Sequence, residues 1–220
     1  MVNISAENIH NVLVLGHGGS GKTMLCESML YAAGHTTRVG KVEDGTTISD
    51  YEPEEQKRQT SVQAAILPTL WKDHKINLID TPGYADFRGE VMSGARVAES
   101  SILVISAAAG IEAGTIQMWN LAKSNNLPQS IYVSKMDREN VDFESLLSSI
   151  KSTFGRQCIP LQIPINDDNG FSGTVNLLEA SGNSNVDPDL VESMREELIE
   201  LVAETDDDLV TKYLEGETLT

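Results

Sequence analysis

The sequence predicts an α/β fold with a doubly wound, mostly parallel sheet, followed by a small α+β part. Short runs of branched apolar residues alternate with stretches of helical spacing, which is the order found in a parallel sheet covered by helices. A glycine-rich loop joins the first apolar run to the first helical stretch. Two further apolar runs have only a short polar turn between them and are expected to form a hairpin within this sheet.

The elements of the first part follow from local patterns. The run NVLVLG is short, branched and apolar, as in a strand that is buried on both faces. A helical spacing comes next and stops at Gly34, where a left-handed cap fits. The runs AAILPTL and KINLID surround the turn Lys72-Asp73-His74. These patterns place strands at 11–16, 64–70 and 75–80, and helices at 22–33 and 86–99.

The segment 36–62 differs from its surroundings. It is polar, rich in Gly, Asp, Glu and Thr, and has little periodicity. Because it is too long for an ordinary connection between two elements, we expect a mobile segment with a function of its own.

The second half of the chain changes character after Gly155. Before it, the patterns place strands at 101–106 and 130–134 and helices at 113–124 and 141–154. After it, CIPLQIPI and TVNLL predict strands around the turn NDDNG, and SGNSN precedes an acidic helical stretch from about Pro188 onward. We therefore divide the chain into residues 1–157 and residues 158–220.

Composition excludes several classes of protein. Cys26 and Cys158 are the only cysteines and lack the spacing of a metal site or a disulfide framework, which favours a reducing compartment. No apolar run approaches the roughly 20 residues that span a bilayer, and the N-terminus has no signal-peptide pattern. The formal net charge of -17 argues against general nucleic-acid binding by the chain. We expect a cytoplasmic protein that binds no membrane.

The first chemical motif is GHGGSGKT, which fits the P-loop pattern GxxxxGK[ST]. Its glycines let backbone N–H groups turn toward a phosphate, Lys22 adds a positive charge at the β and γ phosphates, and the Thr23 hydroxyl can bind Mg²⁺. The motif falls between a buried strand and a helix start, as this mechanism requires. Its members are Gly16, His17, Gly18, Gly19, Ser20, Gly21, Lys22 and Thr23.

The second motif is Asp80-Thr81-Pro82-Gly83, at the end of the predicted strand 75–80. The Asp80 carboxylate can hold Mg²⁺ directly or through water, and the Gly83 N–H is free to sense a γ-phosphate. A DxxG sequence alone is weak evidence, since both residues are common in turns. Its position one hairpin after a P-loop makes the prediction strong.

The third motif is Ser134-Lys135-Met136-Asp137, at the end of the strand 130–134. The Asp137 carboxylate can accept hydrogen bonds from N1 and the exocyclic amino group of guanine, which adenine cannot supply. The stem of Lys135 can lie along the base. Together the three motifs predict binding of GTP and GDP.

The stretches GHGGSGKT, DYEPEEQKRQTSVQ, DTPGYADF, SKMDREN and KYLEGE together resemble elongation factor G and its paralogues among the ribosomal GTPases. The similarity covers essentially the whole chain. It implies a Ras-like P-loop GTPase domain with an inserted subdomain, here from about residue 158 onward. It also implies a GTPase of protein synthesis that binds the ribosome at the stalk and factor-binding site of the large subunit.

The resemblance also implies roles for single residues. Thr23, Ser61 and Asp80 would hold Mg²⁺ between the β and γ phosphates. The segment that ends near Val62 would be switch I, and the segment from Asp80 would be switch II. Catalytic roles would fall to Lys22, Gly83 and Tyr84, with Thr81 and Pro82 completing the loop that faces the phosphates.

Several positions depart from the family pattern. Tyr84 stands where the family has a histidine that positions the attacking water, and a phenol with a pKa of about 10 can orient water but cannot act as a near-neutral base. Ser61 replaces a threonine and Ser134 an asparagine, and both can still hydrogen-bond. Gly18 and Gly19 replace an apolar residue and an aspartate of the P-loop. These departures indicate a divergent paralogue with slow or differently organised hydrolysis.

The family closes its guanine site with a short loop that contains Ser-Ala and follows the inserted subdomain. No suitable copy occurs before Thr220, so we expect the chain to be a fragment with weakened nucleotide binding. Alternatives stay open at this point: a ribosomal protection or release-type GTPase, a GTP-dependent binding switch with little hydrolysis, and a P-loop ATPase or small-molecule kinase. Asp137 argues against the last of these.

Overall fold

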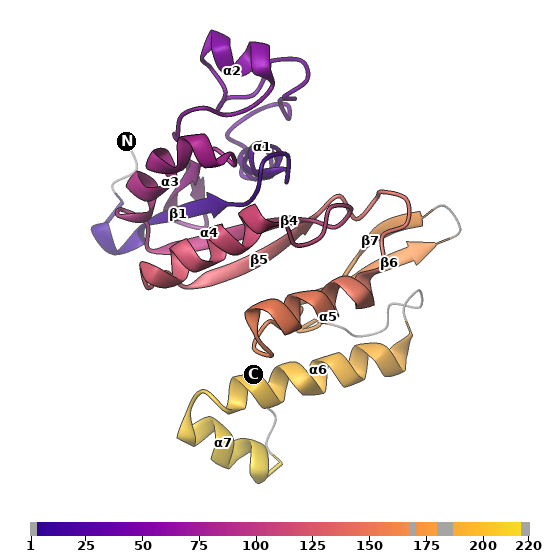
Figure 1. Ribbon diagram of the computed structural model, residues 1–220. Helices are drawn as coiled ribbons and strands as arrows, with labels where there is room; N and C mark the ends of the chain where they lie inside the picture. Colours follow the sequence, from indigo (N-terminus) through magenta and orange to yellow (C-terminus); the bar gives the residue numbers. More distant parts are fainter. Residues whose placement is uncertain (1–3, 168–169, 180–186, 217–220) are drawn as a thin grey trace. The chain divides into compact units, whose positions relative to one another are not determined.

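The structure is a computed structural model that describes residues 4–167, 170–179 and 187–216 (Figure 1). The chain divides into two compact units, Met1–Lys135 and Met136–Thr220. The predicted domain boundary lies at 157/158 instead. That division into a GTPase domain and an inserted subdomain stays a prediction, because compactness does not define the domains of a family.

The first unit is built on a five-stranded sheet with the order β2-β3-β1-β4-β5. Neighbouring strands are parallel except for the antiparallel pair β2 and β3. The predicted α/β fold with a mostly parallel sheet is therefore confirmed. The elements in chain order are η1 (Ala6–Asn8), β1 (Ile9–Leu15), α1 (Lys22–Ala32), α2 (Pro53–Arg58), β2 (Ala65–Trp71), β3 (His74–Asp80), η2 (Ala85–Phe87), α3 (Arg88–Ala95), β4 (Ser100–Ser106), α4 (Ala113–Ser124) and β5 (Gln129–Ser134).

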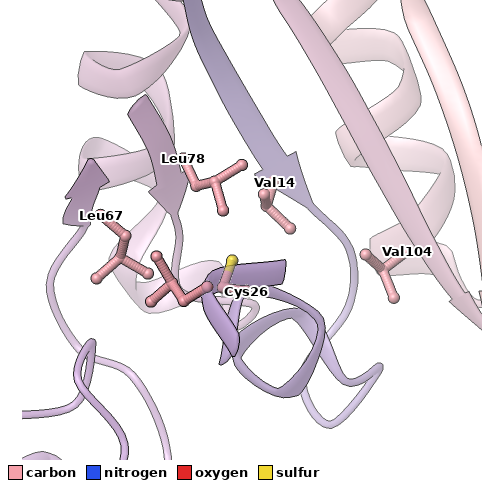
Figure 2. Close-up of a cluster of buried hydrophobic side chains, with 6 residues drawn as sticks. Val14, Cys26, Leu67, Leu78 and Val104 are labelled. Carbon is pink, nitrogen blue, oxygen red and sulfur yellow. The ribbon is translucent and has the colours of Figure 1, made fainter. Parts of the chain in front are cut away.

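A buried apolar cluster joins α1 to the sheet. Its members are Val14, Cys26, Leu30, Leu67, Leu78 and Val104. Figure 2 shows the Cys26 sulfur pointing from the helix toward Val14 and Leu78 on two neighbouring strands. Because β1 is central and α1 follows it directly, this packing holds both ends of the P-loop in place.

Two elements of the first unit differ from the sequence prediction. The polar segment 36–62 contains the short helix α2, whose first turn is closed by a reciprocal cap between Glu52 and Glu55. The helix expected at 86–99 consists of a 3₁₀ turn and the shorter α3, which ends at Ala95. The chain leaves the helix there because Asn11 bonds to the backbone of Val97 and Glu99.

His10 and His74 lie near each other at one end of the sheet, and His74 begins β3 although the sequence analysis placed it in the turn before that strand. They lie on the parallel neighbours β1 and β3, and His10 Nε2 and His74 Nδ1 are 3.0 Å apart. His10 Nδ1 also lies 3.3 Å from Glu99 Oε2. The three residues form a polar cluster on the outside of the sheet.

The described residues of the second unit form a two-stranded antiparallel sheet and three helices. Its elements are α5 (Phe143–Phe154), β6 (Gln162–Asp167), β7 (Gly170–Asn176), α6 (Pro188–Ala203) and α7 (Asp207–Leu214). A buried apolar cluster of this unit consists of Ile163, Ile165, Val175, Leu177 and Leu198. Part of the predicted turn NDDNG and all of SGNSN lie outside the described residues. No helix among the residues described has the length and apolar character needed to cross a membrane.

Candidate functional site

The P-loop connects β1 to α1 and contains three glycines with positive φ: Gly16 (151°), Gly19 (76°) and Gly21 (98°). At Gly16 an added Cβ would lie 2.5 Å from the carbonyl oxygen of Val104 and 2.6 Å from Ser20 Oγ. Only glycine fits at this position, because the backbone conformation and the space both exclude a side chain. The predicted strand, glycine loop and helix therefore occur in the order that a phosphate-binding loop needs.

Lys22 is folded back into the P-loop. The residue is only 6% exposed to solvent, and Nζ donates hydrogen bonds to the carbonyl oxygens of Gly16 (3.1 Å) and His17 (3.0 Å). Burial lowers the pKa of Lys22, while the nearby Asp80 carboxylate opposes this shift. The ammonium group is thus fixed inside the loop, where it can meet a phosphate as a point charge.

The three predicted metal ligands lie together. Thr23 Oγ1 donates a 2.7 Å hydrogen bond to Asp80 Oδ2 and is 3.3 Å from Ser61 Oγ. Ser61 in turn donates a 2.7 Å hydrogen bond to Asp50 Oδ1. The sequence analysis missed Asp50, which brings a second buried carboxylate to this cluster.

The cluster fits a hard divalent cation. Asp80 is buried, and burial raises its pKa to about 6 despite the Thr23 hydrogen bond and the nearby Lys22 charge. Burial also raises the pKa of Asp50. Asp80 Oδ1 and Asp50 Oδ2 are both buried without a hydrogen-bond partner. Oxygen donors of this kind, two of them unsatisfied, match the ligands that Mg²⁺ takes in proteins.

Two buried glutamates hold the backbone of the segment 36–62, Glu27 from the P-loop helix α1 and Glu55 from α2 within the segment itself. Glu27, on α1, accepts hydrogen bonds from the backbone N–H groups of Gly40 (3.0 Å) and Ile48 (2.6 Å). Glu55, on α2, accepts from Val62 (2.9 Å) and Gln63 (3.0 Å), the two residues after Ser61. These carboxylates hold the backbone on both sides of the Asp50 and Ser61 contact, and sequence reasoning did not find them.

The DTPG loop begins where β3 ends. Thr81 Oγ1 donates a 2.6 Å hydrogen bond to the carbonyl oxygen of Val14, which attaches this loop to β1. Gly83 lies directly against the P-loop, since an added Cβ would be 2.5 Å from Lys22 Nζ and 2.6 Å from the Gly18 nitrogen. Tyr84 follows, with about half of its surface exposed. The predicted switch II start thus contacts the predicted phosphate site.

The end of β5 also contacts the P-loop. Ser134 Oγ donates a 2.6 Å hydrogen bond to the carbonyl oxygen of Ser20, and Lys135 Nζ donates one of 2.7 Å to Gly19. The serine that replaces asparagine therefore keeps a structural hydrogen bond to this loop. Met136 and Asp137 lie in the turn that begins the second unit, and their role in binding guanine stays a prediction.

Fold and site together define a P-loop nucleotide-binding domain of the GTPase class. A family model described as "Elongation factor Tu GTP binding domain" matches residues 7–215. The chain belongs to this family and is a GTP-binding domain of the translational GTPase type.

Two curated relatives are similar over 97% of this chain. Elongation factor G of Fervidobacterium nodosum is 32% identical, with 33% of its length covered, and an elongation factor G-like protein of Thermotoga maritima is 35% identical, with 32% covered. A crystal structure of a protein from Thermus thermophilus has a TM-score of 0.89 and 36% identity over 96% of this chain and 34% of that one. The chain spans about a third of the length of the relatives it matches.

Proposed function

We propose that this chain binds and hydrolyses GTP as the nucleotide-binding part of an elongation factor G-like translocase. The single observation that carries the proposal is the meeting of Thr23, Ser61 and Asp80 at the end of the P-loop, where Asp80 Oδ1 and Asp50 Oδ2 are buried without hydrogen-bond partners. The similarity to elongation factor G and to an elongation factor G-like protein supports the assignment to protein synthesis.

Each residue of the site has its own role in binding or hydrolysis. Backbone N–H groups of the P-loop and the start of α1 hold the β-phosphate, and Lys22 places a positive charge beside the phosphates. Thr23, Ser61 and Asp80 hold Mg²⁺, with Asp50 fixing the Ser61 hydroxyl. When bound, Mg²⁺ neutralises charge on the β and γ phosphates. The Gly83 N–H senses the γ-phosphate, and the hydroxyl of Tyr84 orients the attacking water.

The base is selected after β5. The Asp137 carboxylate accepts hydrogen bonds from guanine, and the stem of Lys135 lies along the base while its ammonium group stays on Gly19. Specificity for guanine follows because adenine lacks those donors.

A titration with a fluorescent GDP analogue tests nucleotide binding. The analogue is titrated into the chain with Mg²⁺ and displaced by GDP, GTP or ATP, and the same is done with Asp137→Asn. We expect GDP and GTP to displace it and ATP to fail, with Asp137→Asn weakening binding about tenfold or more. Asp73→Asn, in the exposed turn between β2 and β3, is the matched control and should bind normally. Displacement by ATP as effective as that by GTP would contradict the proposal.

A second candidate is a GTP-dependent binding switch that hydrolyses little GTP. Tyr84 favours it, because a phenol at this position cannot act as a near-neutral base. Measurement of GTP turnover with and without ribosomes separates the two: the translocase requires strong stimulation of turnover by ribosomes, and the switch predicts ribosome binding with GTP but little turnover.

The proposal of a translocase includes binding at the stalk and factor-binding site of the large ribosomal subunit, and a location in the cytoplasm. A ribosomal protection or release-type factor shares this domain and is separated from a translocase by a translocation assay.

A further inference from the structure

The ring of Tyr84 lies over Gly18. A Cβ added to Gly18 would be 2.8 Å from Cζ and 3.0 Å from both Cε atoms of Tyr84. The outer edge of the ring therefore occupies the position that any side chain at residue 18 would take. Because Tyr84 is 52% exposed, this contact holds a ring that is otherwise open to solvent.

Gly83, the residue before Tyr84, lies against the same part of the P-loop. A Cβ on Gly83 would be 2.5 Å from Lys22 Nζ and 2.6 Å from the backbone nitrogen of Gly18. The backbone of the DTPG loop thus lies directly beside Lys22 Nζ, which the proposed function places at the β and γ phosphates, and beside the backbone nitrogen of Gly18. A γ-phosphate that sits between Lys22 Nζ and the Gly83 N–H needs Gly83 to move outward from this position while it still donates its hydrogen bond.

The P-loop side of this contact is held in place by α4. His17 is buried, its Nδ1 lies 3.1 Å from the buried hydroxyl of Thr115, and Gly114 is so close that an added Cβ would be 3.1 Å from His17 Cβ. A P-loop packed against α4 in this way cannot move easily. When the contact opens, Gly83 and Tyr84 are therefore the residues that move.

We propose that Tyr84 is a specificity-determining residue that favours diphosphate over triphosphate, because its contact with Gly18 holds the phosphate site closed. The inference rests on the proposed function and deepens it. A diphosphate leaves Gly83 in place, and the ring stays on Gly18. A triphosphate moves Gly83, its neighbour Tyr84 follows, and the ring contact is lost. The contact therefore lowers triphosphate affinity relative to diphosphate affinity.

The ratio of two dissociation constants tests this directly. The constants for GDP and for a non-hydrolysable GTP analogue are measured with Mg²⁺ for the unchanged chain, Tyr84→Ala and Tyr84→Phe. We expect Tyr84→Ala to shift the ratio about fivefold toward the triphosphate analogue, at the lower end of typical coupling between a ligand and a conformation. Tyr84→Phe keeps the ring and should keep the ratio. Tyr31→Ala, an exposed tyrosine on α1, is the matched control.

A reciprocal change at Gly18 separates the effect of the contact between Tyr84 and Gly18 from a general effect of losing the tyrosine. The methyl group of Gly18→Ala takes the position of the ring edge, so this variant should shift the ratio in the same direction as Tyr84→Ala. The double variant should add little to either single change, because both remove one contact. Normal binding of both nucleotides with an unchanged ratio in Tyr84→Ala would overturn the proposed role of Tyr84 in specificity and leave the GTPase assignment intact. Failure of the unchanged chain to bind any guanine nucleotide would overturn both the proposed function and the proposed role of Tyr84.

Discussion

The Thr23 hydroxyl donates a 2.7 Å hydrogen bond to the buried carboxylate of Asp80, and this bond links the first turn of α1 to the last residue of β3. The two residues are 57 positions apart in the chain. Asp80 keeps its other carboxylate oxygen, Oδ1, buried without a partner. The site is therefore assembled with a carboxylate whose cost of burial is only partly offset by the protein itself.

The stability of the nucleotide-free chain should depend on the protonation of Asp80. Its folded pKa of about 6 lies above the unfolded value of 3.8, so its contribution to stability is complete below pH 3.8 and is lost as the pH rises through 6. The full loss corresponds to about 3 kcal/mol. Urea unfolding in EDTA, at pH 4.5 and pH 7.5, should show that Asp80→Asn gains stability relative to the unchanged chain as the pH rises. Parallel pH profiles of the two proteins would contradict the assignment of this pKa.

The Ser61 hydroxyl should contribute to Mg²⁺ affinity. Ser61→Ala removes one oxygen from the cluster and leaves Asp50 Oδ1 without its donor, so Mg²⁺ should bind the nucleotide complex about tenfold more weakly. Ser61→Thr keeps the hydroxyl and serves as the control. Titration of Mg²⁺ against a fluorescent GTP analogue measures both. Equal Mg²⁺ affinity in the alanine and threonine variants would show that Ser61 is not a ligand.

Glu55 should stabilise the fold through the backbone around Ser61. Its carboxylate accepts from the N–H groups of Val62, Gln63 and Glu52. Glu55→Gln turns one acceptor oxygen into a donor that faces an N–H group, so the free energy of unfolding should fall by about 1–3 kcal/mol. Its neighbour Glu54 forms only an exposed ion pair with Arg58, and Glu54→Gln should cost less than about 0.5 kcal/mol. Urea unfolding of the two variants measures the difference, and similar losses would refute the buried role of Glu55.

The sequence predicted the sheet and the P-loop well because both leave local patterns. The runs before Gly16 and before Thr81 are apolar and end at turn residues, and this places the two loops at neighbouring strand ends. Asp50, Glu27 and Glu55 could not be found in that way. A carboxylate in a polar segment has the same local pattern whether it is solvated or buried against backbone N–H groups, and only the tertiary fold decides. The Tyr84 and Gly18 contact is of the same kind, since the two residues meet only after both loops have folded.

The two cysteines should differ sharply in reactivity. Cys26 is fully buried in the cluster under the sheet, and burial raises its pKa well above the usual value, so little thiolate is available and reagents cannot reach it. Burial also raises the pKa of Cys158, but this residue is only partly buried. A thiol reagent at pH 8 should therefore modify Cys158 alone in the native chain and both cysteines in urea. Mass spectrometry of the labelled peptides assigns each site. Modification of Cys26 at a rate near that of Cys158 under native conditions would mean that the packing between α1 and the sheet opens readily, and that the P-loop is not held as firmly as the cluster of Val14, Leu78 and Val104 implies.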